Sequence, residues 1–181
     1  ASTANYLRVS GWQPGLTWGY EVTLPPNFDY RLLEAGKKTV KQWRNLGIRR
    51  PGARMEHASE MADLILPAGA NGPAFLIFKN FRFIKRSNNS DAYAMSVGHL
   101  GDRIAGLPAF SQSWPTDDRP LTKSQREELQ ALLNRRGYNV GAVDGKIGRK
   151  TRDAIRRYQN AKGITPDGHA SLLLLERLRQ G

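Results

Sequence analysis

Three histidines are the side chains of this chain best suited to hold a metal ion, and their spacing argues against it. His57, His99 and His169 are single and far apart, and no two have the short-loop or helix-face spacing of metal ligands. We expect each to be a packed or surface residue, and we expect no metal site and no cofactor. Cysteine is absent, so there is no disulfide framework, which suits the cytoplasm or a periplasm.

The stretch with the clearest organisation is 137–159, which reads GYNVGAVDGKIGRKTRDAIRRYQ. A glycine-rich loop with one Asp-Gly step precedes a helix that is expected to begin near Gly148. The helical period places on one side Thr151, Ala154, Ile155, Tyr158 and Ala161. It places on the other side Arg149, Arg152 and Arg156. We expect the first side to pack and the second to meet solvent or an acidic partner.

Similar helix signals lie on both sides of this stretch. Thr122 and Gln125 form a capping-box pattern ahead of a leucine-rich helix, and Gly137 and Gly163 stand where helices end. Asp167-Gly168 predicts a turn. Ser171 can then cap a third helix, which carries Leu172, Leu175 and Leu178. The pattern of helix, glycine and Asp-Gly turn therefore runs twice, and it predicts a small three-helix bundle.

The first 110 residues mix short strands and helices. Alternation from Trp18 to Leu24 predicts a half-buried strand, and a short helix is expected from about Lys37 to Gly47. The segments 73–79 (PAFLIFK) and 81–86 (FRFIKR) read as two more strands, joined as a hairpin or a bent ribbon. Asn89 or Ser90 can cap a helix that ends at Gly106, with one face formed by Tyr93, Val97, Leu100 and Ile104. The fold class is therefore α+β.

Charge and composition divide the chain in the same way. The formal net charge is +12, and residues 119–181 hold fourteen Lys and Arg against six Asp and Glu. Such a basic region attracts nucleic acid, anionic lipid or a cell wall with peptide carboxylates, and charge alone does not choose among them. No run approaches eighteen apolar residues, so no transmembrane segment is expected. Residues 111–120 (SQSWPTDDRP) read as a linker.

The C-terminal pattern GYNVGAVDGKIGRKTRDAIRRYQNAKGITPDG resembles the peptidoglycan-binding module appended to many bacterial cell-wall hydrolases and lyases. The leucine-rich first helix, DGxxGxxT and the later Asp-Gly step occur in the module's order. The resemblance implies a shallow groove that holds glycan or stem peptide, and the candidates on or beside the central loop are Tyr138, Asp144, Ile147 and Arg152. The alternative for each is structural: Tyr138 and Ile147 in the core, Asp144 in a turn and Arg152 solvated.

A second resemblance covers most of the first 110 residues. ANYLRVSGWQPG, LPAGANGPAFLIFKNFRFI and NNSDAYAMSVGHLGDRIAG are similar to the C-terminal part of the catalytic domain of the lytic murein transglycosylase B family. It implies a partial lysozyme-like domain with a small β subdomain over residues 1–110, a linker at 111–120 and the peptidoglycan-binding bundle over 121–181.

This family cleaves the MurNAc–GlcNAc bond of peptidoglycan and forms a 1,6-anhydromuramoyl end without adding water. One glutamic acid protonates the leaving oxygen and then assists the attack of the muramoyl C6 hydroxyl, so one carboxyl with a raised pKa suffices. In the family that glutamate lies upstream of the matching segments, and Glu21, Glu34, Glu56 and Glu60 stand in other settings. We therefore expect the acid to lie before residue 1 in a longer parent, and this chain to be inactive alone. A calcium loop would also lie upstream.

The same resemblance places three residues on the wall of the family's glycan cleft: Tyr6, Asn88 and Tyr93. Aromatic rings there stack on sugars, and an amide fixes an N-acetyl or hydroxyl group. Many members have Tyr where this chain has Ser87, which puts one stacking contact in doubt. Core packing is the alternative for Tyr93, and a turn or helix cap is the alternative for Asn88.

Three functions remain open from the sequence. The chain can be the C-terminal part of a lytic transglycosylase in the periplasm or cell envelope of a Gram-negative bacterium. Its partners would then be glycan strands and stem peptides, with other cell-wall enzymes as further candidates. It can instead be a non-catalytic peptidoglycan-binding protein. Charge alone suggests a nucleic-acid-binding protein, but neither a helix-turn-helix signature nor an aromatic-basic β motif is present, so no nucleic acid is expected.

Overall fold

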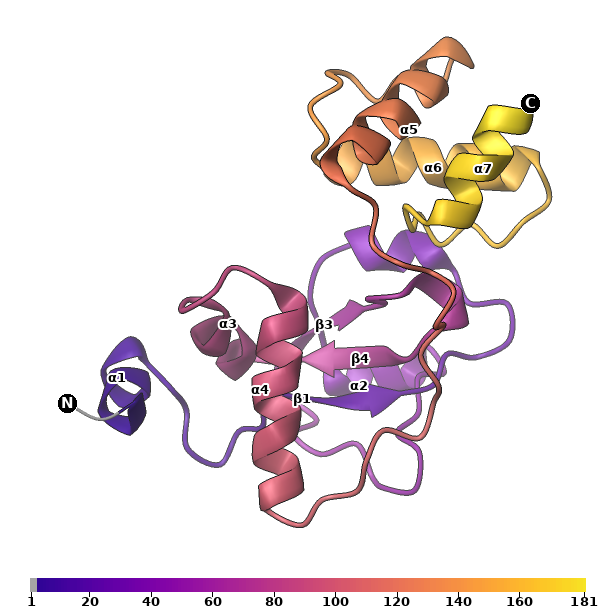
Figure 1. Cartoon of the computed structure of the whole chain (residues 1–181). Helices are drawn as coiled ribbons and strands as arrows, with labels where there is room; N and C mark the ends of the chain where they lie inside the picture. Colours follow the sequence, from indigo (N-terminus) through magenta and orange to yellow (C-terminus); the bar gives the residue numbers. More distant parts are fainter. Residues whose placement is uncertain (1–2) are drawn as a thin grey trace. The chain divides into compact units, whose positions relative to one another are not determined.

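The computed structural model describes residues 3–181, which divide into two compact units. The first unit comprises the chain up to Pro67 together with Pro73–Ser113, and the second comprises Ala68–Gly72 and Trp114–Gly181. Figure 1 labels their helices and strands. This division falls between Ser113 and Trp114, inside the segment that the sequence marks as a linker.

The first unit is built on a four-stranded antiparallel sheet of order β1-β4-β3-β2. Its strands are β1 (Gly19–Val22), β2 (Lys38–Thr39), β3 (Met61–Ile65) and β4 (Ala74–Ile77). Its helical segments are α1 (Thr3–Ser10), η1 (Tyr30–Glu34), α2 (Val40–Asn45), α3 (Lys79–Lys85) and α4 (Asp91–Ile104). Helices and a small antiparallel sheet together confirm the α+β class.

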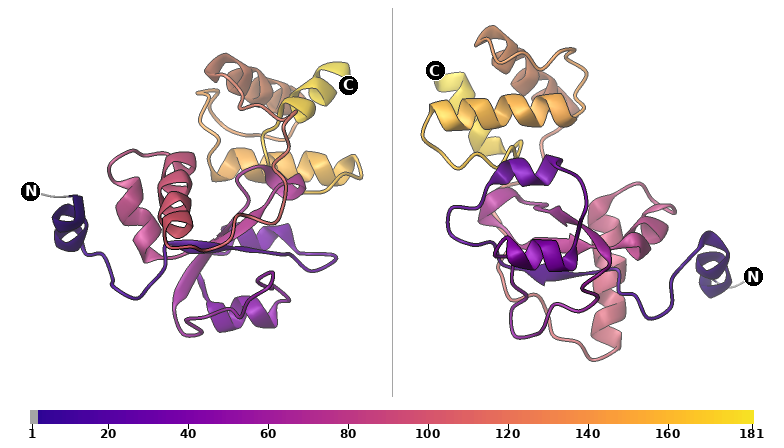
Figure 2. Two further views of the ribbon diagram at one scale, coloured as in Figure 1. Left: turned by 60° about the horizontal axis from the view of Figure 1, so that its bottom comes forward. Right: turned by 180° about the vertical axis from the view of Figure 1, so that it is seen from behind.

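The central strand β4 is buried on both faces because each face carries its own core. Leu76 packs with Trp43 of α2 on one face, whereas Phe75 packs with α3 and α4 on the other. The view from behind shows α2 over its face of the sheet (Figure 2). A strand buried on both faces reads as a continuous apolar run, which is why the segment 73–79 was recognisable as a strand.

The segment FRFIKR is a helix, and the sequence-based prediction of a strand there is wrong. It lies in α3, where Phe81 and Ile84, three residues apart, enter the same core. Asn80 at the start of α3 is fully buried, and its amide donates to the carbonyl oxygens of Gln13 and Leu16 at 2.9 and 2.6 Å. These distant contacts hold α3 in place, and a short apolar run alone does not distinguish strand from helix.

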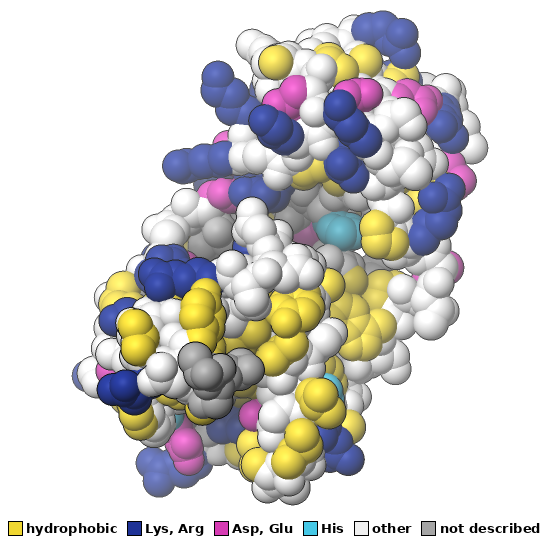
Figure 3. Space-filling view, turned by 60° about the vertical axis from the view of Figure 1, so that its left-hand side comes forward, with side chains coloured by type: hydrophobic (Ala, Val, Ile, Leu, Met, Phe, Trp, Pro, Cys, Tyr) yellow, Lys and Arg dark blue, Asp and Glu magenta, His cyan; other side chains and the backbone are white. Residues whose placement is uncertain are grey.

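Helix α4 begins after Ser90, whose side chain accepts from the Tyr93 N–H, so Ser90 rather than Asn89 is the cap. The apolar face predicted for this helix is exposed: Tyr93, Val97, Leu100 and Ile104 are 39%, 40%, 61% and 79% accessible. The core side of the helix is formed instead by Ala94, Met95 and Gly98. Figure 3 shows hydrophobic side chains on the surface of the first unit, on the side that this view brings forward.

The second unit holds the predicted three helices, α5 (Lys123–Arg135), α6 (Arg149–Ala161) and α7 (Leu172–Gln180), with the short η2 (Gly69–Asn71). The capping box of Thr122 and the cap by Ser171 are confirmed. Leu129, Leu133, Ile155, Leu175 and Leu178 are fully buried in its core.

Two residues of α6 lie on the side opposite to the predicted one. Arg156, expected to face solvent, is only 5% exposed, and its guanidinium contacts the Asp153 carboxylate at 2.6 Å. Ala161, expected to pack, is exposed. The long aliphatic stem of arginine can cover apolar surface, and the helical period does not reveal this.

Candidate functional site

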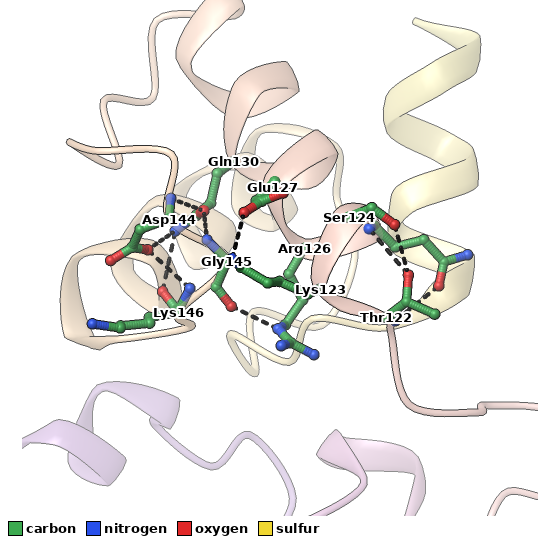
Figure 4. A network of polar contacts seen from close by, with 10 residues as sticks. Thr122, Lys123, Ser124, Arg126, Glu127, Gln130, Asp144, Gly145 and Lys146 are labelled. Carbon is green, nitrogen blue, oxygen red and sulfur yellow. Dashed lines mark hydrogen bonds and ion pairs between the residues drawn. The ribbon is translucent and has the colours of Figure 1, made fainter.

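The loop before α6 is held by one buried glutamine of α5. Gln130 is 1% exposed, and its carbonyl oxygen accepts from the backbone N–H groups of Asp144 and Gly145 at 3.0 and 2.8 Å. Its amide nitrogen lies 3.1 Å from the Lys146 carbonyl oxygen and 3.3 Å from the Thr151 hydroxyl. Figure 4 shows Gln130 beside Asp144, Gly145 and Lys146 at the Asp-Gly turn. The loop therefore has a fixed shape.

Asp144 itself is exposed, and its carboxylate closes the turn. Oδ1 accepts from the Lys146 N–H at 2.9 Å and from the Gln130 amide at 3.2 Å. The Lys146 backbone hydrogen bond, followed by that from Gln130, lowers the pKa of Asp144. The carboxylate is therefore held ionised, with the turn bonds on Oδ1.

The second Asp-Gly turn repeats this arrangement. Gln159 of α6 is 6% exposed; its carbonyl oxygen accepts from the Gly168 N–H at 2.9 Å and its amide donates to Asp167 Oδ1 at 2.7 Å. Asp167 Oδ1 also accepts from the His169 N–H at 2.9 Å. In both turns a helix cap follows four residues after the Asp, at Gly148 and at Ser171. The pattern that occurs twice in the sequence thus forms the same kind of turn twice in the structure.

The other groove candidates have structural contacts of their own. Tyr138 is half-buried and packs edge-on against the Tyr158 ring, with centroids 5.6 Å apart. Arg152 donates to the Ile147 carbonyl oxygen at 2.9 Å, so these two candidates lie together, and Ile147 is half-buried. The contacts show what these residues do in the free unit; their part in a groove stays a prediction.

Beside the second turn the second unit has a cavity of about 330 Å³ that no sequence motif indicates. It is lined by Ala68, Ala70, Asn71, Gln159, Gly163, Ile164, Thr165, Asp167, His169, Ser171, Leu173, Leu174 and Arg177.

His169, expected to be a packed or surface residue, is partly buried and also belongs to this cavity wall. Its Nε2 lies 2.8 Å from Asp118 Oδ2, and Asp118 Oδ1 accepts from the Leu172 N–H at 3.2 Å. The partner lies 51 residues away in the chain. That separation is why the pair could not be read from spacing.

In the first unit, the three candidate cleft residues are all exposed. Tyr6 lies on α1 and is 48% accessible, Asn88 lies in the loop between α3 and α4, and Tyr93 lies in the first turn of α4. Helix α1 contacts α3, and α3 contacts α4, so the three come from neighbouring elements. Because Tyr93 is exposed, core packing does not explain its presence. Because Ser90 is the cap of α4, helix capping does not explain Asn88.

The carboxylates of the first unit have distinct environments. Glu21 accepts from the backbone N–H groups of Ser111 and Gln112 at 2.7 and 2.8 Å, so it fixes the segment that follows α4. Asp102 accepts from the Trp18 indole N–H at 2.8 Å. Burial, opposed by this hydrogen bond, raises the pKa of Asp102. No local pattern in the sequence singles out Asp102, because its partner is 84 residues away.

Within residues 3–181, no three acidic or histidine side chains gather where they could hold a metal ion. In the same described part of the chain, no helix is both long and apolar enough to cross a membrane.

Two family models match this chain. The transglycosylase SLT domain model matches residues 1–102, which is more than half of the chain, and the peptidoglycan binding domain model matches residues 122–178. A comparison with curated proteins finds no match.

Among solved structures, SltB3 from Pseudomonas aeruginosa in complex with NAG-anhNAM-pentapeptide is similar, with 47% identity and a TM-score of 0.90. The match covers 98% of this chain and 48% of that chain. SltB3 in complex with NAG-NAM-pentapeptide matches with 48% identity, the same coverage and a TM-score of 0.90. The chain thus spans about half the length of these solved relatives. On the family match and the fold together, the chain belongs to the transglycosylase SLT domain family and carries a peptidoglycan-binding domain in its C-terminal part.

Proposed function

We propose that this chain is part of a lytic murein transglycosylase, to which it contributes one wall of the glycan cleft and a peptidoglycan-binding unit. The observation that carries the proposal is the likeness to SltB3, which extends over 98% of this chain at 47% identity and includes both units. SltB3 was solved with a disaccharide-pentapeptide and with its anhydro form. Identity at this level across both units supports the same substrate class, which is glycan with attached stem peptide.

The reaction needs one acid that donates its proton to the glycosidic oxygen and then, as a carboxylate, accepts the proton of the muramoyl C6 hydroxyl as that oxygen attacks C1. We propose that this acid lies outside residues 1–181. The carboxylate of Glu21 is occupied by backbone N–H groups, and Glu56 and Glu60 are exposed rather than enclosed in an apolar pocket. The general acid of such a reaction needs an apolar enclosure, which these exposed side chains lack.

Within the cleft wall, Tyr6, Asn88 and Tyr93 are the proposed sugar contacts. Exposed tyrosine rings offer flat apolar faces, and an exposed amide offers both a donor and an acceptor for an N-acetyl group. Val97, one turn beyond Tyr93 on the same face of α4, is exposed to the same degree and provides a matched control. Tyr93→Ala should weaken binding of NAG-NAM-pentapeptide severalfold, and Val97→Ala should not. Equal affinities for the two variants, measured by calorimetry, would remove Tyr93 from the site.

The second candidate function is a peptidoglycan-binding protein without catalysis, which the residues of the second unit favour because they form fixed loops and a cavity. In either case we propose the cell envelope as the place of action. The periplasm of a Gram-negative bacterium is the finer proposal, supported by the likeness to a Pseudomonas aeruginosa protein. Other cell-wall enzymes stay candidate partners.

Sedimentation of the purified chain with insoluble peptidoglycan sacculi tests the binding function. Because the chain carries a net charge of +12, double-stranded DNA is added as a competitor at the same salt concentration. We expect the chain to sediment with sacculi at DNA concentrations that saturate any nonspecific binding. Release of the chain by DNA would favour the nucleic-acid alternative, and no sedimentation at all would refute the proposal.

A further inference from the structure

Among the residues that the structure describes, the cavity beside the second Asp-Gly turn offers a ligand no open carboxylate. Asp167 is the acidic residue of its wall, and both of its oxygens are engaged: Oδ1 by Gln159 and His169, and Oδ2 by the Ala70 N–H at 2.8 Å. A ligand that seeks a carboxylate therefore finds none open here.

The groups still open on this wall can all donate hydrogen bonds, and the charged one among them is a cation. Arg177 is exposed, and within the described residues it makes neither a side-chain hydrogen bond nor an ion pair. The Ser171 oxygen accepts from the Leu174 N–H at 3.0 Å, which leaves its hydroxyl proton available. The Thr165 hydroxyl and the Asn71 amide likewise have no partner in the part of the chain that the structure describes. Donors around one guanidinium favour an anion, above all a planar carboxylate.

The rest of the wall is apolar. Ile164, Leu173 and Leu174 line it, and Leu173 is 57% exposed. The volume of about 330 Å³ lies at the lower end of the range for small-molecule sites, about 300–1,000 Å³. An inorganic anion would leave most of this space and the apolar wall unused. A short peptide end with small apolar side chains fills both.

We infer that this cavity binds the free carboxylate end of a short peptide with small apolar side chains, and that Arg177 binds the carboxylate. The inference rests on the proposed function, because a stem peptide that ends in a free carboxylate is the component of peptidoglycan with this chemistry. The cavity thereby gives the second unit a site for the peptide rather than for the glycan.

The test is a nuclear magnetic resonance titration of the full chain with N-acetyl-D-alanyl-D-alanine, with its C-terminal amide and with inorganic phosphate. We expect the acid to shift resonances of Leu173 and His169, and the amide to bind about tenfold more weakly because the charged hydrogen bonds are lost. Phosphate that matches the acid in affinity would reduce the cavity to an unselective anion site and overturn the inference.

Arg177→Gln is the decisive variant, because it keeps a polar side chain that can donate hydrogen bonds but removes the charge. Its affinity for the acid should fall about tenfold, to that of the amide. Arg149→Gln is the matched control: Arg149 is exposed in the first turn of α6 and does not line the cavity. Equal losses in both variants would show a general charge effect and would refute the site. The wild-type chain can bind sacculi while the Arg177→Gln variant keeps its full affinity for the acid. That result would overturn this inference alone and leave the proposed function standing.

Discussion

Replacing Gln130 by Met tests whether one side chain holds the loop that carries the groove candidates. Methionine has nearly the volume of glutamine, so the change removes hydrogen bonds without opening a large cavity. The side chain is 1% exposed, and the Gly145 N–H that it binds at 2.8 Å is buried. That N–H would be left unsatisfied in the folded unit.

The size of the effect follows from these bonds. One buried donor left without a partner costs about 1–3 kcal/mol. The Asp144 N–H, which is partly buried, and the Thr151 hydroxyl, which is buried, each lose a partner as well. We expect the second unit to lose about 2–4 kcal/mol, which in a domain of this size lowers the melting temperature by roughly 10–25 °C.

Far-UV circular dichroism during urea unfolding measures this loss. Tryptophan fluorescence separates the units once Trp114, the one tryptophan of the second unit, is replaced by Phe, because Trp12, Trp18 and Trp43 lie in the first one. The part of the circular dichroism signal that comes from the helices of the second unit should be lost at lower urea, while the fluorescence transition stays in place. Gln180→Met, at an exposed position of α7, is the control and should change stability by less than about 0.5 kcal/mol. A loss as small as this in Gln130→Met would refute the role given to the glutamine.

Two further predictions concern the first unit. Gly98→Ala should reduce stability by about 1–3 kcal/mol, because the added Cβ would lie 2.6 Å from the Trp18 ring. Gly101→Ala on the same helix meets nothing within 4 Å and should raise stability by about 0.5–1 kcal/mol. Equal melting temperatures of the two variants would contradict the packing of α4. Because burial raises the pKa of Asp102, the folded state holds this proton more tightly than the unfolded state, and its stabilisation is lost as pH rises through the folded pKa. Asp102→Asn should therefore melt higher than the wild type at about pH 7 and together with it at about pH 3, and a variant that melts lower at pH 7 would reverse the assigned sign.

Local signals were sufficient for much of the second unit. Thr122 and Ser171 cap helices as their types predict, and the helices end before Gly137 and Gly163, which have positive φ of 81° and 66°. Capping and glycine preferences depend on a few neighbouring residues, so they can be read without tertiary structure. Arg156 and Ala161 are exceptions, since the burial of each depends on what α6 packs against.

Features that depend on distant contacts were beyond such reasoning. Phe81 sits in a helix because Asn80 anchors that helix to a loop more than sixty residues earlier. The pairs of Trp18 with Asp102 and of Asp118 with His169 are likewise remote in sequence. The cleft contacts Tyr6, Asn88 and Tyr93 came from the resemblance and stay predictions, now with exposure in their favour.

The most direct test of the central claim is mass analysis of the soluble products after this chain is incubated with peptidoglycan sacculi, with SltB3 as the positive control. We predict that SltB3 releases anhydromuropeptides and that this chain, although it sediments with the sacculi, releases none. Anhydromuropeptides produced by the chain alone would contradict the claim that its acid lies outside residues 1–181. They would make Asp102, whose pKa is raised by burial, the first residue to replace.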